Sequence, residues 1–159
     1  MFLNHFKMND HPFQERPPVE WILNDNRISE SLARLDYFAQ QGTLALLVGQ
    51  TGVGKSTLLR LFIQNLSKNR YRPLYLHFTG VPSTGLFRLI VTQLGEAPRR
   101  GKENLFLQIL ERTAKGDLIT LLIIDEAHLI DPQALTDLRL LVSSALDTDV
   151  PVKIVLSGQ

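Results

Sequence analysis

A glycine-rich stretch in the first third of the chain carries residue types that bind phosphate. Residues 49–56 read GQTGVGKS and fit the pattern G-x-x-x-x-G-K-[ST] at every fixed position. Glycines let the backbone turn sharply and bring its N–H groups against phosphate oxygens. Lys55 is expected to reach the β- and γ-phosphates and to be catalytic, and the Ser56 hydroxyl to ligate Mg²⁺. The predicted nucleotide-contacting residues are Gly49, Gln50, Thr51, Gly52, Val53, Gly54, Lys55, Ser56 and Thr57.

The segments on either side of this stretch match the structural context that such a loop requires. Residues 44–48 form a short apolar run, which predicts a strand buried on both faces. From Lys55 onward the apolar residues return at helical spacing, so a helix over about 55–66 would direct its free N–H groups at the same anion. The alternative is a strand-to-helix turn that binds no ligand. The context favours a nucleotide site.

A second group of polar residues follows the apolar run of residues 118–124. The chain there reads Asp125-Glu126-Ala127-His128, and an acidic pair at the tip of a buried strand is costly without cations or hydrogen bonds. Asp125 is predicted to hold Mg²⁺ opposite Ser56, and Glu126 to orient or deprotonate the attacking water. The alternative is that both acids open a surface turn. His128 is expected to pack or to form hydrogen bonds rather than to catalyse.

Two further groups of polar residues each allow two interpretations. Ser157 and Gln159 follow the predicted last strand, where they either sense the γ-phosphate and its water or form a strand-end turn. Arg99, Arg100 and Lys102 make a basic loop, which either touches nucleic acid or is simply solvated.

Strands and helices alternate along the chain. Strands are predicted over residues 44–48, 73–78, 118–124 and 152–156, with helices between them. Asn26 and Gly42 are predicted to cap an amphipathic helix before the first strand, Ser83 or Thr84 to cap a later one, and Asp131 with Pro132 to start the last. This order predicts a parallel sheet with helices on both faces and a ligand at the carboxyl ends of its strands.

The bulk composition is that of a globular domain. The chain has 159 residues, is 44% hydrophobic and 21% charged, and carries a net charge of +1, so any DNA or membrane partner must depend on a local patch. It has no cysteine, which excludes disulfides and thiolate metal sites. There is no signal-like or membrane-spanning run, and a cytoplasmic protein without membrane insertion is expected.

Residues 1–20 are predicted to form an arm and 21–159 the nucleotide-binding core. The apolar anchors expected to dock the arm on the core are Phe2, Leu3, Phe6 and Phe13.

The chain resembles the AAA+ ATPases of the ExeA/TniB type. The matching segments are LNHFKMNDHPF, SLARLDYF, GQTGVGKST, LIIDEAHLI followed by ALTDLRLL, and KIVLSGQ, which together cover nearly the whole chain. The resemblance implies an α/β fold of the P-loop NTPase (ASCE, AAA+) class. It implies a three-layer sandwich with a mostly parallel sheet and a strand inserted between the two motif-bearing strands. It also implies ATP rather than GTP, with Mg²⁺ as the cofactor.

The chain departs from that family at its end. Family members continue into a fifth strand, an arginine-bearing segment and a helical lid, so the fold is expected to be truncated before them. In the family's strand order the fifth strand flanks the phosphate-loop strand, so its absence would leave residues 44–48 at an open edge. Binding of ATP and ADP with weak hydrolysis is therefore expected.

The resemblance leaves several functions open. The first is an accessory ATPase that acts on DNA or transposase assemblies, as a homo-oligomer when full length. The alternative is an ATPase of a general secretion pathway, with a secretion component as its partner. A DEAH-type helicase and a nucleotide-dependent scaffold without turnover are the remaining hypotheses.

Overall fold

The computed structural model describes residues 2–11, 14, 18–23, 25–77 and 80–159. The strands are β1 (Leu44–Val48), β2 (Tyr71–His77), β3 (Ile119–Asp125) and β4 (Val152–Gly158). The α-helices are α1 (Phe2–His5), α2 (Asn26–Gln41), α3 (Lys55–Asn65), α4 (Ser83–Gln93), α5 (Lys102–Ala114) and α6 (Pro132–Asp147). Two short 3₁₀ turns, η1 (Val19–Trp21) and η2 (Ala127–Leu129), complete the order. None of the helices in the described residues is both long and apolar enough to cross a membrane.

The four strands form one sheet in the order β1-β4-β3-β2, and every neighbouring pair is parallel. The predicted parallel sheet is therefore confirmed, as is the insertion of a strand between the two that carry the motifs. In this order β4 lies directly beside both β1 and β3. The residues that follow β1, β3 and β4 consequently meet at one edge of the sheet.

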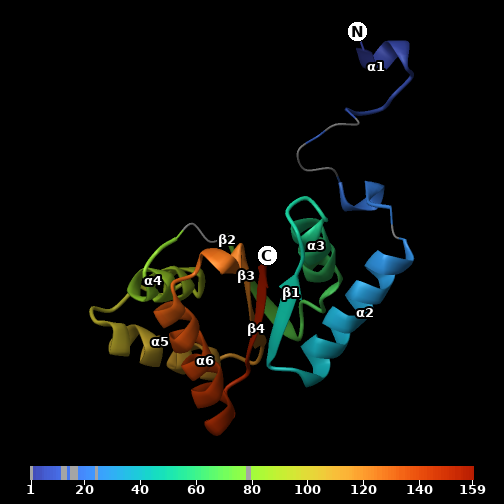
Figure 1. Cartoon of the computed structure of the whole chain (residues 1–159). Helices are drawn as coiled ribbons and strands as arrows, with labels where there is room; N and C mark the ends of the chain where they lie inside the picture. Colours follow the sequence, from blue (N-terminus) through green and yellow to red (C-terminus); the bar gives the residue numbers. More distant parts are fainter. Residues whose placement is uncertain (1, 12–13, 15–17, 24, 78–79) are drawn as a thin grey trace.

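Helices cover both faces of the sheet and give three layers (Figure 1). The α4, α5 and α6 helices bury one face, where Leu86, Ile90 and Leu141 pack against Leu122 and other strand residues. On the other face, α2 and α3 bury a second apolar cluster. Its members include Leu35, Phe38, Leu59, Phe62, Ile123 and Val155. This arrangement is the predicted α/β three-layer sandwich.

The first strand is not buried on both faces, contrary to the prediction from its apolar run. Leu46 and Val48 are 68% and 71% exposed, and Leu44 is also exposed. Only β4 pairs with β1, which therefore forms an edge of the sheet in the described residues, as expected from the family's strand order. Ala45 and Leu47 face the α2–α3 layer, whereas nothing described covers the opposite side chains. An apolar run therefore marks this strand correctly but does not reveal its place in the sheet.

The predicted helix ends are correct in part. Asp25, not Asn26, caps α2, because its carboxylate accepts the Ile28 N–H at 2.9 Å. Gly42 ends that helix as predicted, its N–H donating to the Phe38 carbonyl. The α4 helix begins after Pro82 without a side-chain cap, so neither Ser83 nor Thr84 caps it. The Asp131-Pro132 start of α6 is confirmed, with the Asp131 side chain accepting the Gln133 N–H.

The predicted N-terminal arm contains α1 and the start of η1 but does not bury all its predicted anchors. Phe6 is 55% exposed, so the expectation that it docks on the core is wrong, whereas Leu3 is half-buried. The side chain of Phe2 and all of Phe13 lie outside the described residues. The division into an arm and a core stays a prediction.

Candidate functional site

The glycine-rich stretch forms a loop between β1 and α3. The Gly49 N–H donates to the Gly158 carbonyl at 3.1 Å, which ties the start of the loop to the end of β4. Gly52 and Gly54 have φ of 84° and 96°, a left-handed backbone that glycine adopts without a Cβ clash. The α3 helix begins at Lys55, and its first free N–H groups face the inside of the loop.

The Lys55 side chain lies inside this loop and is buried. Its ammonium donates to the Gly49 carbonyl at 2.7 Å and to the Gln50 carbonyl at 3.0 Å. The lysine therefore holds two loop carbonyls and places its positive charge at the centre of the loop, where an anion would bind.

The Asp125 carboxylate is the centre of the site and is fully buried. Its Oδ2 accepts the hydroxyls of Ser56 and Tyr75, each at 2.6 Å. Its Oδ1 accepts the Ser157 hydroxyl at 2.8 Å and the backbone N–H of Glu126 at 3.0 Å. Burial raises the pKa of Asp125, but the hydrogen bonds from Ser56, Tyr75 and Ser157 outweigh it and leave the pKa below its usual value. The group is therefore an anion held by four donors.

Glu126 follows Asp125 in the chain, but its side chain lies near a different residue. Its backbone is left-handed, with φ of 57°, and this turn separates its side chain from that of Asp125. The side chain is about a third exposed, and its Oε2 lies 3.4 Å from Nδ1 of His128. His128 also lies against β4, where a Cβ on Gly158 would come within 3.0 Å of the His128 backbone nitrogen.

Both residues predicted as nucleotide sensors lie at the site. The hydroxyl of Ser157 is buried and bonds Asp125, as described above. The side-chain amide of Gln159 donates to the Thr51 hydroxyl at 2.6 Å. The end of β4 thus contacts both the carboxylate and the tip of the glycine-rich loop.

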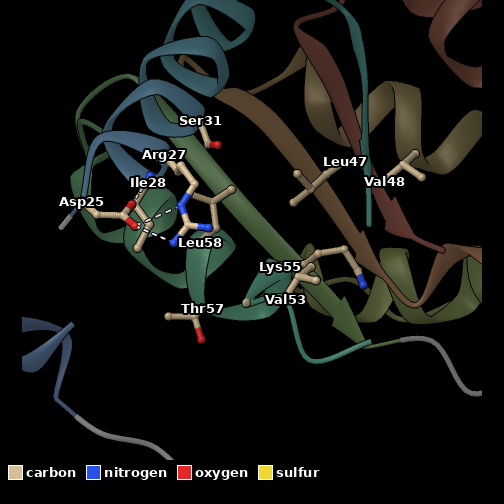
Figure 2. A pocket seen from close by; sticks show the side chains of 11 residues that line it. Asp25, Arg27, Ile28, Ser31, Leu47, Val48, Val53, Lys55, Thr57 and Leu58 are labelled. Atoms are coloured by element: carbon tan, nitrogen blue, oxygen red, sulfur yellow. Dashed lines mark hydrogen bonds and ion pairs between the residues drawn. The ribbon is translucent and has the colours of Figure 1, made fainter. Parts of the chain in front are cut away.

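Two cavities lie on either side of this loop. One of about 250 Å³ is lined by Thr51, Gly52, Gly54, Lys55, Ser56, Thr57 and Glu126. The other, of about 460 Å³, opens between the loop, β1 and the start of α2 (Figure 2). Its apolar lining includes Ile28, Leu47, Val53 and Leu58, and Arg27 lies at its border, paired with Asp25 at 2.9 Å. Gly54, Lys55 and Thr57 line both cavities, so the two cavities adjoin along the loop.

The basic loop of residues 98–102 is largely paired with carboxylates. Lys102 donates to both oxygens of Asp137, at 3.0 and 2.8 Å, and Arg99 lies 3.1 Å from Glu111. Asp137 is buried in α6, so this ion pair joins α5 to α6. Arg100 is exposed on the same loop.

Tyr75 is a residue of the site that the sequence patterns did not indicate. An aromatic residue in a strand is ordinary, and only the pairing of β2 with β3 places its hydroxyl beside Asp125. Burial, together with the bond to Asp125, raises the pKa of the Tyr75 hydroxyl, which therefore stays protonated and serves as a donor.

The family described as AAA domain matches residues 39–159, which is most of the chain. No curated protein sequence is similar enough to count as a match.

Several solved structures have the same fold. Cdc6p from Pyrobaculum aerophilum has a TM-score of 0.70 at 22% identity, covering 94% of this chain and 41% of that one. Orc1 of Aeropyrum pernix, solved in complex with DNA, has a TM-score of 0.68 at 19% identity, covering 86% and 39%. The Walker-type ATPase PABY2304 of Pyrococcus abyssi has a TM-score of 0.57 at 18% identity, covering 91% and 48%. The chain therefore spans less than half the length of each of these proteins.

Proposed function

The chain belongs to the AAA domain family, and from that premise we propose that it binds ATP with Mg²⁺ and hydrolyses it. The observation that carries the proposal is the 2.6 Å bond between the Ser56 hydroxyl and the Asp125 carboxylate, directly beside the glycine-rich loop. A carboxylate oxygen is a ligand for a cation, and the free N–H groups of the adjacent loop are donors for an anion, so the two together suit a ligand that brings both. A phosphate group with its metal ion meets both requirements.

The residues present suit Mg²⁺. The cation prefers oxygen ligands and keeps several waters, so it is usually held by one or two carboxylates together with substrate phosphates. Ser56 and Asp125 supply a hydroxyl and a carboxylate oxygen side by side, while the described residues hold no cluster of three or more His, Asp or Glu side chains suited to a metal. When bound, Mg²⁺ would offset the charge of the β- and γ-phosphates.

The remaining residues of the loop suit the triphosphate. We assign the free backbone N–H groups of the loop and of the first turn of α3 to the phosphate oxygens, and the Lys55 ammonium to the β- and γ-phosphates. For this, Lys55 exchanges its two carbonyl acceptors for phosphate oxygens. Glu126, which lines the smaller cavity, accepts the proton of the attacking water. Ser157 and Gln159 are assigned to sensing the γ-phosphate, through Asp125 and Thr51 respectively.

The larger cavity suits a nucleoside. A base and ribose need a partly apolar space next to the phosphate site, and this cavity shares Gly54, Lys55 and Thr57 with the smaller one. We propose that the adenine of ATP lies there, against Ile28 and Leu47 (Figure 2).

Binding of a fluorescent ATP analogue with and without Mg²⁺ tests this function. Replacing Lys55 by alanine should weaken binding by about tenfold or more, since it removes a charged donor to the phosphates. Lys68→Ala, in the exposed turn after α3, is the matched control and should leave the affinity unchanged. Glu126→Gln should keep ATP binding and lower hydrolysis by about 100-fold or more. An unchanged affinity in Lys55→Ala would refute the proposed site.

For the biological role we propose an accessory ATPase that acts on DNA or transposase assemblies, as a homo-oligomer when full length. The support is the ExeA/TniB-type resemblance, together with a fold shared with Orc1, which was solved in complex with DNA. Assembly should be measured by light scattering with ATP or ADP, with and without duplex DNA, over a series of salt concentrations. Assembly that requires ATP and responds to DNA supports this role. Assembly indifferent to DNA favours the secretion-pathway alternative.

A further inference from the structure

We propose that Tyr75 is a positioning residue of the magnesium site, holding the Asp125 carboxylate in the orientation that the cation requires. The inference rests on the proposed binding of ATP with Mg²⁺. It concerns a residue on β2, outside both the glycine-rich loop and the acidic segment, and it assigns the Tyr75 hydroxyl a role beyond the packing of its ring.

The register of the sheet brings the two side chains together. Tyr75 pairs with Ile123 and His77 pairs with Asp125, so Tyr75 and Asp125 lie two positions apart on adjacent strands. Alternation along parallel strands then places both on the same face of the sheet, within reach of one another. The Tyr75 hydroxyl lies 2.6 Å from Oδ2 of Asp125.

The surroundings hold Tyr75 in place from two sides. Its ring packs against the apolar cluster under α2 and α3, and its carbonyl accepts the side-chain amide of Gln93 at 3.1 Å. A phenylalanine would satisfy the packing equally well. The hydroxyl is therefore the part of the side chain that packing does not explain, and it donates to Asp125.

The bonds around Asp125 show why a second donor on Oδ2 matters. Each carboxylate oxygen accepts two donors, and the pair on Oδ2 consists of Ser56 and Tyr75. The Ser56 hydroxyl has a second role in the proposed site, because its oxygen is also a proposed ligand of Mg²⁺. The Tyr75 hydroxyl is not a proposed ligand of Mg²⁺, and it donates to Oδ2 at 2.6 Å. It can thus fix Oδ2 whether or not the cation is bound.

Replacing Tyr75 by phenylalanine tests the role, because it removes only the hydroxyl. The binding of a fluorescent ATP analogue should be titrated with Mg²⁺ and repeated in EDTA. We expect the affinity in EDTA to stay within about twofold of the original, while the Mg²⁺ concentration for half-saturation rises about tenfold, the usual effect of losing one hydrogen bond to a charged group.

Tyr71→Phe is the matched control. Tyr71 lies on the same strand, packs in the same apolar cluster, and donates its hydroxyl to the Ala39 carbonyl at 3.0 Å, away from Asp125. Both variants lose one hydroxyl bond, but only Tyr75→Phe should change the Mg²⁺ dependence. An equal change in both variants, or none in Tyr75→Phe, overturns the proposal.

A measurement on the unaltered sequence covers the case in which the variant fails to fold. The chain has three tyrosines, so labelling with 3-fluorotyrosine gives three ¹⁹F resonances. Adding Mg²⁺ to the ATP-bound protein should shift the Tyr75 resonance and leave that of Tyr71 in place; no shift at Tyr75 overturns the proposal. Failure of the unaltered protein to bind ATP overturns the proposed function, and this inference with it. Binding of ATP without an effect at Tyr75 overturns this inference alone.

Discussion

The ion pair between Lys102 and Asp137 gives a prediction about stability that does not depend on any ligand. Lys102→Met keeps an unbranched side chain of similar length and removes the charge and the N–H donors. It leaves the Asp137 carboxylate, which is 5% exposed, with weaker neutral partners. These are the Gln133 side-chain amide at 3.4 Å and the Ser83 hydroxyl. The variant therefore isolates the cost of an uncompensated buried charge.

The structure sets the expected size of this cost. Breaking a fully buried ion pair by removing one partner costs about 3–5 kcal/mol. The Lys102 side chain is 37% exposed, so water reaches the vacated position and the neutral donors remain. We therefore expect a loss of about 2–3 kcal/mol, a large share of the roughly 5–15 kcal/mol that stabilises a domain.

The loss of stability in Lys102→Met should depend on pH in a definite direction. Burial raises the pKa of Asp137, but the bond from Lys102 and its neighbours outweigh it, and the pKa lies below its usual value. A group with a lowered pKa contributes stability above its unfolded pKa and loses that contribution as the pH falls through the folded pKa. Without Lys102 the buried carboxyl takes up a proton at higher pH. The difference between the two proteins should be full near neutral pH and shrink below about pH 4.

Urea unfolding followed by circular dichroism measures this difference. Arg100→Met is the matched control, since Arg100 is exposed on the same loop, and it should change stability by less than about 0.5 kcal/mol. The double variant Lys102→Met/Asp137→Leu should recover most of the loss, because no buried charge remains. A loss below about 0.5 kcal/mol in Lys102→Met, or one of equal size at acid and neutral pH, would refute the reasoning.

Substitutions at three other positions have expected effects on the free energy of unfolding, measured in the same way. Thr120→Val should raise it by about 1 kcal/mol, because the Thr120 hydroxyl is buried without a hydrogen-bond partner in the described residues; no gain would mean that the hydroxyl is satisfied. Gly158→Ala should lower it by about 1–3 kcal/mol, because the new Cβ would lie 3.0 Å from the His128 backbone nitrogen; a neutral effect would contradict this close approach. Asp131→Ala should lower it by about 1 kcal/mol through loss of the Gln133 cap bond, and Asp131→Asn should restore most of that stability.

The sequence allowed the order of strands and helices to be predicted with small errors at their ends. The β3 strand was expected over residues 118–124 and spans Ile119–Asp125, and β2 was expected over 73–78 and spans Tyr71–His77. Apolar periodicity carries this information, because each element needs one apolar face. The N-cap of α2 was misassigned by one residue, since Asp25 and Asn26 both have cap-forming side chains and only the backbone decides between them.

The place of each strand in the sheet was harder to predict. An apolar run is the same in a central strand and in an edge strand, so the run alone predicts burial of residues 44–48, although Leu46 and Val48 are exposed. The open edge was expected only from the strand order that the family resemblance implies. The contacts of Tyr75 and Lys102 were not predicted either, because they too depend on how the elements are arranged in space. Tyr75 reaches Asp125 only through the register of β2 and β3, and Lys102 reaches Asp137 only through the packing of α5 against α6. Such pairings join residues that are far apart in the chain and leave no local pattern.

The hydrogen bonds of Asp125 combine residues that the sequence motifs predict with residues that only the assembled sheet brings together. Asp125 and Ser56 belong to the two sequence motifs. The other side-chain donors, Tyr75 and Ser157, come from β2 and β4, the strands on either side of β3. A shift of α3, β2 or β4 relative to β3 would therefore break at least one bond to this carboxylate. Because a buried anion that loses a donor is costly, the position of Asp125 is coupled to the assembly of the whole sheet edge. A ligand bound between Ser56 and Asp125 would thus be sensitive to residues well outside the loop that binds its phosphates.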